Sequence, residues 1–191
     1  MTDNLSARAV ALVGMPGAGK TLCAQHLRSR GFYEFRFGGI VTDEITRRGW
    51  AINPENERIV REELRANEGM DVMAKHALPH LKEALQTHRC IIIDGLYSWS
   101  EYRTLNRELD ADLKIIAIFS PRQVRYQRLT GRIDRPLTIE EARARDYREI
   151  EYLEKGGPIA IADYTLVNDG DPAALLAALD ALIDALDCVP G

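Results

Sequence analysis

The chain has 191 residues, 46% of them hydrophobic and 28% charged, and these proportions exclude wholesale disorder, a collagen-like chain and a coiled coil. A net charge of −4 disfavours proteins whose main task is to grip a nucleic-acid backbone. Apolar runs such as 115–119 are too short to span a membrane, and residues 1–8 lack the pattern of a secretion signal. We therefore expect a single domain over 1–191 with neither a membrane nor a nucleic-acid partner.

The three cysteines, Cys23, Cys90 and Cys188, are far apart in the sequence and form no CxxC pair. Close pairs are typical of structural zinc sites, and an even number of cysteines is typical of disulfide frameworks. We therefore expect neither feature, and the pattern favours a reducing cytoplasm.

The first predicted strand, 9–13, leads into an octet and then into a helical stretch, 22–30. The octet matches the phosphate-binding pattern GxxxxGK[ST] in full, and it has the strand–loop–helix context that the mechanism requires. Glycines let successive N–H groups point at an anion, and the helix N-terminus adds positive charge. We expect the whole octet to bind ATP, with Lys20 acting in catalysis on the β- and γ-phosphates and Thr21 holding Mg²⁺. Its residues are Gly14, Met15, Pro16, Gly17, Ala18, Gly19, Lys20 and Thr21.

The second predicted strand, 33–37, precedes a region of candidate acceptor-binding residues. Asp43 could orient an acceptor hydroxyl, although an acid favoured by a helix N-terminus is the alternative interpretation. A helix is predicted to begin at Asn53-Pro54, because Asn caps helices well and Pro fits the first turn. Arg58, Arg61 and Arg65 lie at i, i+3 and i+7 along this helix as candidates for the acceptor phosphate. The charges around them have mixed signs, so a solvated outer face is the other interpretation.

The third predicted strand, 90–93, ends at Asp94. Open α/β sheets bind ligands at the carboxyl ends of their strands, so Asp94 is a candidate Mg²⁺ ligand, with a turn cap as the alternative. Gly95 stands where motor-type and transporter-type ATPases usually place a water-activating glutamate, which favours transfer of phosphate to a bound acceptor. Tyr97 follows closely and could either contact the acceptor by stacking or simply pack.

The fourth predicted strand, 115–119, leads through an expected helix start at Ser120-Pro121 into a segment rich in arginine. Guanidinium groups on a closing lid stabilise the charge that phosphoryl transfer spreads over oxygen atoms, so we expect this arginine cluster to act in phosphoryl transfer. Nucleic-acid binding is the main alternative. The segment carries Arg122, Arg125, Arg128, Arg132 and Arg135 with no acid before Asp134, and Arg135 and Arg145 are further candidates.

The remaining elements carry local signals. Thr138 and Glu141 have the spacing of a capping box. A fifth strand is predicted at 164–167, and a last helix is predicted to begin at Asp171-Pro172 and to pack its stripe of leucines on the sheet. Because helical stretches separate runs that are apolar on both faces, the chain predicts repeated βαβ units and a doubly wound α/β sheet.

Three stretches resemble the P-loop nucleoside and nucleotide kinases: 14–21, 91–97 and 128–132. Stretches over nearly the whole chain resemble a group of adenylate-kinase-related, dephospho-CoA-kinase-like proteins from archaea and bacteria: 55–64, 68–70, 155–160 and 162–170. The resemblance implies a three-layer α/β/α P-loop NTPase fold with a five-stranded parallel sheet of order 2-3-1-4-5. It implies a core of 8–37, 88–121 and 160–187, an acceptor-binding insertion at about 38–80 and an arginine-rich lid at about 122–150.

The same resemblance implies roles for single residues. Arg128 would stack on adenine and Arg132 would hold phosphates, and both would act in catalysis from the lid. Asn168 and Gly170 would lie beside the adenine. The stretch 38–42 departs from adenylate kinases, because it lacks their acceptor-binding Asp and Arg. Asp43 is also displaced from the position of the acid in dephospho-CoA kinases. The donor half of the site is therefore better specified than the acceptor half.

These observations favour a cytoplasmic kinase that uses ATP and Mg²⁺ and transfers phosphate to a nucleotide or a nucleotide-like small molecule. A nucleotide-binding switch or regulatory ATPase without a small-molecule acceptor is the alternative. A kinase of polynucleotide ends is a third reading, which the acidic net charge disfavours. Monomer and dimer are both compatible with the composition.

Overall fold

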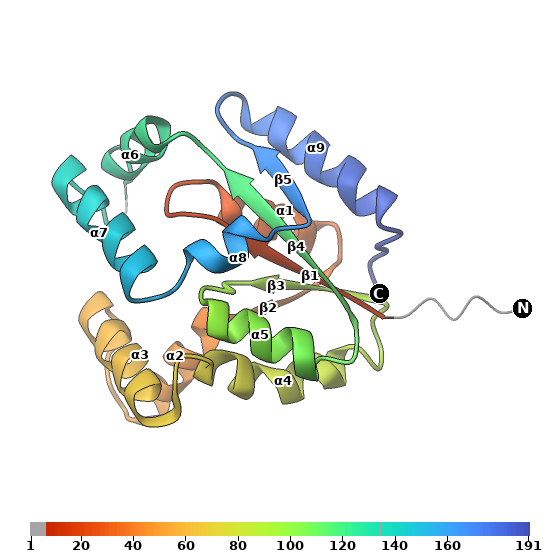
Figure 1. The fold of residues 1–191 in the computed structure, drawn as a ribbon, viewed down its shortest axis with the longest axis horizontal. Helices are drawn as coiled ribbons and strands as arrows, with labels where there is room; N and C mark the ends of the chain where they lie inside the picture. Colours follow the sequence, from red (N-terminus) through yellow and green to blue (C-terminus); the bar gives the residue numbers. More distant parts are fainter. Residues whose placement is uncertain (1–6, 134) are drawn as a thin grey trace, which may run out of the picture.

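Five parallel strands form one sheet in the computed structural model, which describes residues 7–133 and 135–191. The strand order is β2-β3-β1-β4-β5, so the predicted fold class and strand order are confirmed (Figure 1). All strands run the same way, and their carboxyl ends therefore meet at one edge of the sheet. The strands are β1 (Arg8–Val13), β2 (Tyr33–Arg36), β3 (Cys90–Asp94), β4 (Asp112–Phe119) and β5 (Tyr164–Val167).

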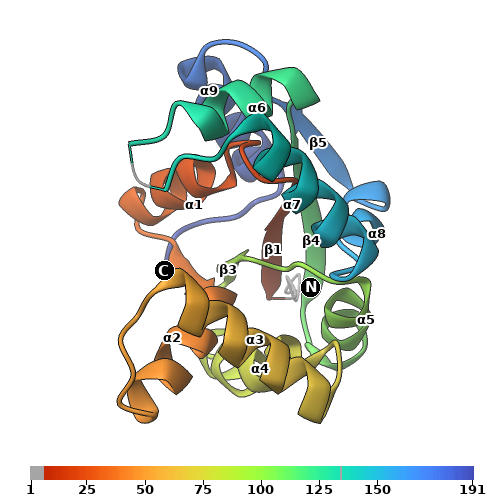
Figure 2. The same cartoon turned by 90° about the vertical axis from the view of Figure 1, so that its left-hand side faces the viewer.

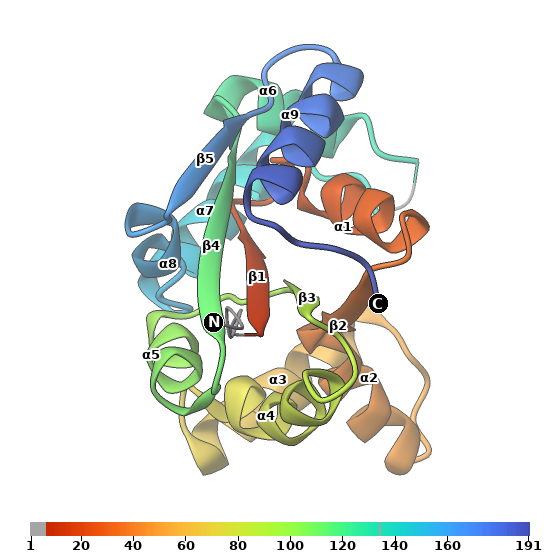
Figure 3. The ribbon, with the colours of Figure 1, turned by 90° about the vertical axis from the view of Figure 1, so that its right-hand side faces the viewer.

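Helices cover both faces of the sheet, because alternate strand residues point to opposite sides (Figures 1 and 3). On one face Ala11 and Ile93 pack in a buried cluster with Ile45 and Leu81. On the other face Leu12 packs with residues of the first and last helices. The first face carries α2 (Phe37–Arg47), α3 (Pro54–Glu68), α4 (Val72–Ala84) and α5 (Trp99–Glu108), and the second carries α1 (Lys20–Ser29) and α9 (Pro172–Ala185).

A separate helical pair follows β4. It consists of α6 (Arg122–Thr130) and α7 (Ile139–Glu151), which pack on each other through Leu129 and Ala142, and the short α8 (Gly156–Ala160) follows. In Figure 2 this pair lies on one side of the carboxyl ends of the strands, and α3 lies on the other side. Asp134, in the connection between the two helices, and residues 1–6 lie outside the described residues.

Most predicted boundaries are confirmed by their capping hydrogen bonds. Asn53 Oδ1 accepts a hydrogen bond from Asn56 N at 2.9 Å, and Asp171 Oδ1 accepts one from Ala173 N at 2.9 Å. The Thr138–Glu141 capping box is present. The last helix packs Leu175, Leu179 and Ile183 into the core, as predicted.

Several boundaries differ from the predictions. β4 begins at Asp112 rather than at 115, and α1 begins at Lys20 rather than at 22. α6 begins at Arg122 rather than at Pro121, and the Ser120 hydroxyl accepts a hydrogen bond from Arg128 instead of capping the helix. β2 ends at Arg36, because Phe37 begins α2 and is buried in the same cluster as Val41.

The expectation that the cysteines stay unpaired is wrong for Cys90 and Cys188. They form a disulfide that joins β3 to the segment after α9. Their separation of 98 residues hides this contact from any local pattern. Cys23 is free and buried. None of the described helices combines the length and the apolarity needed to cross a bilayer.

Candidate functional site

The loop between β1 and α1 is shaped by three glycines with positive φ: Gly14 at 146°, Gly17 at 80° and Gly19 at 111°. A Cβ at Gly17 would lie 2.8 Å from the Arg125 carbonyl oxygen, and a Cβ at Gly19 would strike the Asn168 amide. Both backbone conformation and space therefore require glycine here. α1 begins at Lys20 directly after this loop, without a side-chain cap from the described residues. Its first-turn N–H groups are therefore available to an anion.

Two buried side chains hold this loop from outside. Arg125 Nη1 donates to the Pro16 carbonyl oxygen at 3.0 Å, and its guanidinium forms a bidentate pair with Asp146 of α7 at 2.9 and 2.6 Å. Asn168 Nδ2 donates to the Ala18 carbonyl oxygen at 2.7 Å. The phosphate loop is thus held both by the α6–α7 pair and by the loop after β5.

Arg128 joins these two supports. Its guanidinium donates to the carbonyl oxygen of Asn168 at 3.1 Å, to Asn168 Oδ1 at 3.1 Å and to Ser120 Oγ at 3.3 Å. The structure therefore brings together Arg128 and Asn168, two residues predicted to bind ATP. Gly170 lies in the same loop, two residues further on.

Lys20 and Asp94 lie close enough for their charges to interact at the carboxyl edge of the sheet. β1 and β3 are neighbours, with Leu12 opposite Asp94, so Asp94 lies beside the start of the phosphate loop. The pKa of Lys20 is lowered to about 7, chiefly by burial and next by the positive charge of Lys155, while the negative charges of Asp94 and Glu149 oppose the shift. Thr21 is exposed in the first turn of α1. An anion bound beside Lys20 would stabilise the positively charged form of its side chain.

The sequence prediction missed Lys155 and Glu149. The Lys155 ammonium pairs with the Glu149 carboxylate, and both side chains are buried, with 3% and 9% exposed. Glu149 also accepts a hydrogen bond from Arg145 Nε at 2.9 Å. The spacing of Arg145 and Glu149 signals a pair on one helix. No local pattern in the sequence connects Lys155 and Glu149 to Lys20, which lies more than a hundred residues away in the chain.

Tyr97 lies in the middle of these charges. Burial raises its pKa to about 12, and the negative charges of Asp94 and Glu149 act in the same direction, whereas Arg61 and Arg36 oppose them. Arg61 of α3 is half-buried and makes no hydrogen bond or ion pair with any described residue. Burial lowers the pKa of its guanidinium. Arg61 is therefore a desolvated cation that lacks an anion.

A buried pair beneath Tyr97 fixes its backbone. Glu101 Oε2 accepts hydrogen bonds from Tyr97 N at 2.8 Å and from Ser98 N at 3.0 Å. Glu101 Oε1 lies 3.4 Å from Arg65 Nη2. Arg65 Nε is buried without a hydrogen-bond partner in the described part of the chain. Arg65 thus supports the loop after β3 from below, a role that its helical spacing could not reveal.

The structure does not gather the other predicted acceptor residues around Lys20. Arg58 is exposed and pairs with Glu62 at 2.8 Å, as in a solvated helix face. Asp43 is exposed and lines a hollow of about 250 Å³ on α2, α3 and α4 together with His76 and His80. Of the described residues that line this hollow, none belongs to the phosphate loop.

The exposed residues after α6 also have defined surroundings. Arg135 Nη1 lies 3.7 Å from Glu57 Oε2 at the start of α3, so this contact links the α6–α7 connection to the opposite side of the site. Arg132 is exposed in the same connection.

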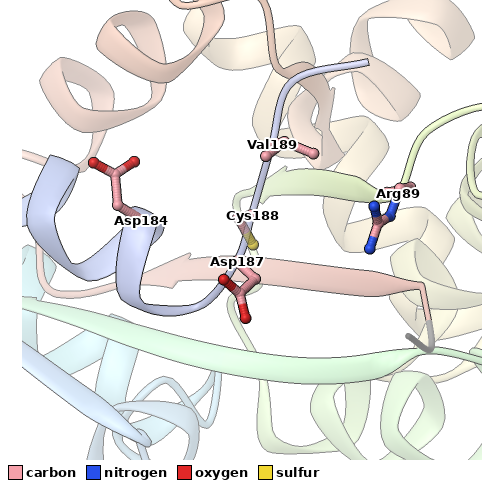
Figure 4. A pocket seen from close by; sticks show the side chains of 5 residues that line it. All are labelled: Arg89, Asp184, Asp187, Cys188 and Val189. Carbon is pink, nitrogen blue, oxygen red and sulfur yellow. The ribbon is translucent and has the colours of Figure 1, made fainter. Parts of the chain in front are cut away.

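A second hollow, of about 450 Å³, lies at the amino end of β3, away from Asp94 at the carboxyl end (Figure 4). None of the described residues around it is a predicted site residue. It is lined by Arg89, Asp184, Asp187, Cys188 and Val189.

The residues at the carboxyl edge fit a nucleoside triphosphate with Mg²⁺. The glycine loop leaves a cradle that a Cβ would fill, and Lys20 places a cation there. The Thr21 hydroxyl and the Asp94 carboxylate are oxygen ligands of the kind that Mg²⁺ prefers. Within the described ranges no group of three or more His, Cys, Asp or Glu side chains could hold a metal. A magnesium ion that takes further ligands from phosphate and water suits such a donor set.

Comparison with known proteins gives the chain a family. A family model described as an AAA domain matches residues 10–154. UPF0200 protein TK1334 of Thermococcus kodakarensis is 34% identical over 180 residues, which cover 93% of this chain and 97% of that protein. A UPF0200 protein of Thermococcus sibiricus is 36% identical over 163 residues, which cover 84% of this chain and 85% of that protein. The chain belongs to the UPF0200 family and contains an AAA domain.

Solved structures show the same fold as this UPF0200 chain. TT1252 from Thermus thermophilus has a TM-score of 0.67 and 21% identity, and the match covers 95% of this chain and 98% of that one. A shikimate kinase from Bacteroides thetaiotaomicron has a TM-score of 0.56 and 17% identity, with coverage of 95% and 98%. The UPF0200 chain therefore has a P-loop kinase-like fold. Its narrower kinship with adenylate kinases or dephospho-CoA kinases stays a prediction.

Proposed function

We propose that the protein is an ATP- and Mg²⁺-dependent kinase that transfers a phosphoryl group to an anionic, nucleotide-like small molecule. The observation that carries the proposal is the meeting of two differently built halves at one edge of the sheet. A glycine cradle with Lys20 and Asp94 forms the first half, and the anion-deficient Arg61 beside Tyr97 forms the second.

The first half binds the donor. The N–H groups of the loop and the Lys20 ammonium hold the β- and γ-phosphates, while Thr21 and Asp94 hold Mg²⁺. Bound Mg²⁺ neutralises phosphate charge. Asn168, Gly170 and Arg128 flank the base at the loop after β5. Arg132 reaches the phosphates from the α6–α7 connection.

The second half binds the acceptor. Arg61 is a half-buried cation whose partner is missing among the described residues, and a phosphate or carboxylate of the acceptor supplies it. Gly95 provides no carboxylate beside Asp94 to activate water, which favours transfer over hydrolysis. The acceptor oxygen bonds to the γ-phosphorus as the bond to the β–γ bridging oxygen breaks. The electron pair of that bond leaves with ADP, and any acceptor proton passes to solvent.

The test incubates the purified protein with ATP, Mg²⁺ and one acceptor at a time, and follows ADP together with phosphorylated product. The panel contains AMP, CMP, dTMP, dephospho-CoA, shikimate and a short RNA. ADP formation that depends on a small acceptor supports the kinase. Slow ADP formation without any acceptor, or nucleotide binding without turnover, contradicts it and favours the regulatory switch.

A further inference from the structure

Lys155 is a buried lysine at the junction of α7 and α8, and it has an unusual set of neighbours. Its side chain is 3% exposed and pairs with Glu149. Lysine is rarely buried without a paired anion. Glu149, however, is shared with Arg145, whose Nε donates to it at 2.9 Å. Two cations thus share one carboxylate, and the group keeps a positive excess.

This excess faces the phosphate loop. Among the charges that act on the Lys20 ammonium, that of Lys155 is the largest. Two ammonium groups that repel each other inside a protein cost free energy until an anion lies near both. A ligand that brings negative charge between them would remove this cost.

Tyr97 fixes the side from which Lys155 approaches. The Lys155 Nζ atom lies 4.8 Å from the centroid of the Tyr97 ring. The ring packs on Gly95, where a Cβ would come within 3.2 Å of ring atoms, and Gly95 directly follows Asp94. Lys155 therefore lies beside the strand end that carries Asp94, in the same neighbourhood as Tyr97 on the acceptor side.

The Lys155 ammonium also has N–H groups that remain available to a ligand. A lysine ammonium has three N–H groups. Glu149 accepts one of them, and the face of the Tyr97 ring attracts the cation from a second direction. A phosphoryl group in transit carries negative charge on three equatorial oxygens, so cations on more than one side of it stabilise that charge.

We propose that Lys155 binds the transferred phosphoryl group from the acceptor side, opposite Lys20, and that Glu149 positions it there. The proposal rests on the kinase function proposed above. It assigns Lys155 a contact with the reacting oxygens, whereas Glu149 acts only through Lys155.

The decisive experiment compares two ligand states, because it needs no identified acceptor. Binding of Mg·ADP is measured by calorimetry with and without aluminium fluoride, which mimics the phosphoryl group in transit. We expect aluminium fluoride to tighten Mg·ADP binding at least tenfold in the wild type. We expect Lys155→Met to lose this gain while its affinity for Mg·ADP alone changes less than threefold. Lys155→Arg should recover part of the gain, since it restores the charge.

Two controls separate charge from folding. Lys114→Met removes a lysine that pairs with Asp112 at 2.8 Å at the start of β4, and it should keep the full gain. The double variant Lys155→Met/Glu149→Gln removes the buried carboxylate together with its lysine partner, so it should fold even where the single variant is unstable, and it should still lack the gain. With a working acceptor, Lys155→Met should lower kcat about a hundredfold or more with little change in the KM for ATP.

A Lys155→Met protein that keeps the aluminium fluoride gain within twofold would overturn the role of Lys155. A different result would overturn the kinase function itself. If the wild type binds Mg·ADP and aluminium fluoride adds nothing, no phosphoryl group is stabilised at this site, and the inference about Lys155 falls with the proposed function.

Discussion

At the scale of single residues, the phosphate cradle depends on positions that admit no side chain. Gly17 has φ of 80°, and a Cβ there would meet the Arg125 backbone. Gly17→Ala should therefore lose about 1–3 kcal/mol of unfolding free energy and most of its ATP affinity. Urea unfolding and nucleotide titration measure both effects.

Gly39→Ala is the matched control. Gly39 lies inside α2 with open space around its Cα, and alanine favours helix, so this variant should gain up to about 1 kcal/mol and bind ATP normally. Equal effects of the two substitutions would contradict a special role for Gly17.

Lys20 combines a functional role with a structural cost. Lys20→Met should lower turnover about 10²–10³-fold, because one contact to the developing charge is lost. Its unfolding free energy should stay equal or rise, since the substitution removes a desolvated ammonium that Lys155 repels. Steady-state kinetics and urea unfolding on the same preparation test both statements. Near-normal turnover would refute the role assigned to Lys20.

At the scale of elements, the α6–α7 pair is held together by a buried ion pair. Arg125 and Asp146 are 7% and 6% exposed. Asp146→Ala leaves the Arg125 guanidinium buried without its partner, and such losses cost about 3–5 kcal/mol. Arg125→Met/Asp146→Ala should cost less than the sum of Arg125→Met and Asp146→Ala, because neither charge remains. A double-mutant cycle by urea unfolding decides, and additive effects would show that the pair is not coupled.

The contact between α1 and α9 should make stability depend on pH. Asp180 accepts hydrogen bonds from Arg30 at 2.6 Å and from His26 at 2.7 Å. Burial raises the pKa of Asp180, but these hydrogen bonds outweigh it, and the net shift is downward from 3.8. The folded state therefore holds its proton less tightly than the unfolded state, and the carboxylate stabilises the fold above pH 4.

The corresponding variant is Asp180→Asn. Because the carboxylate is about a third exposed, the substitution should cost no more than about 1 kcal/mol at pH 7. The difference from the wild type should fade as the pH falls below 4. Thermal unfolding across pH 3–7 measures it, and a difference that persists unchanged at pH 3 would exclude this linkage.

Local signals in the sequence were enough to place the five strands and the starts of the helices capped by Asn53, Thr138 and Asp171. Buried strands such as β3 are short apolar runs in the sequence. Capping residues such as Asn53 bond to the first turn of the helix that follows them, so both signals are local. The partners of the arginine segment could not be predicted in this way, because Asp146, which pairs with Arg125, comes from the following helix, and Asn168, which pairs with Arg128, comes from the loop after β5. The proximity of Lys155 to Lys20 and Tyr97 depends on how whole helices pack, so the spacing of residues along the sequence could not predict it.

At the scale of the whole molecule, the disulfide joins segments far apart in the chain. Cys90 and Cys188 are 98 residues apart, and a crosslink that closes so long a loop reduces the freedom of the unfolded chain. Cys188→Ser should therefore lower the unfolding free energy by about 2–4 kcal/mol under oxidising conditions.

A reductant distinguishes the crosslink from local packing. Dithiothreitol should bring the wild type down to the level of Cys188→Ser and leave the variant itself unchanged in urea unfolding. A wild type that does not respond to reductant would argue that this bond contributes nothing to stability.

One guanidinium links two parts of the site that must work together. Arg125 holds the carbonyl of Pro16 in the phosphate loop and the carboxylate of Asp146 in α7. A nucleotide that changes the conformation of the phosphate loop therefore also shifts α7, and a displacement of α7 changes the conformation of the loop. Thermodynamic linkage then applies. If a ligand that binds one position of α7 changes the affinity for nucleotide by some factor, nucleotide changes the affinity for that ligand by the same factor.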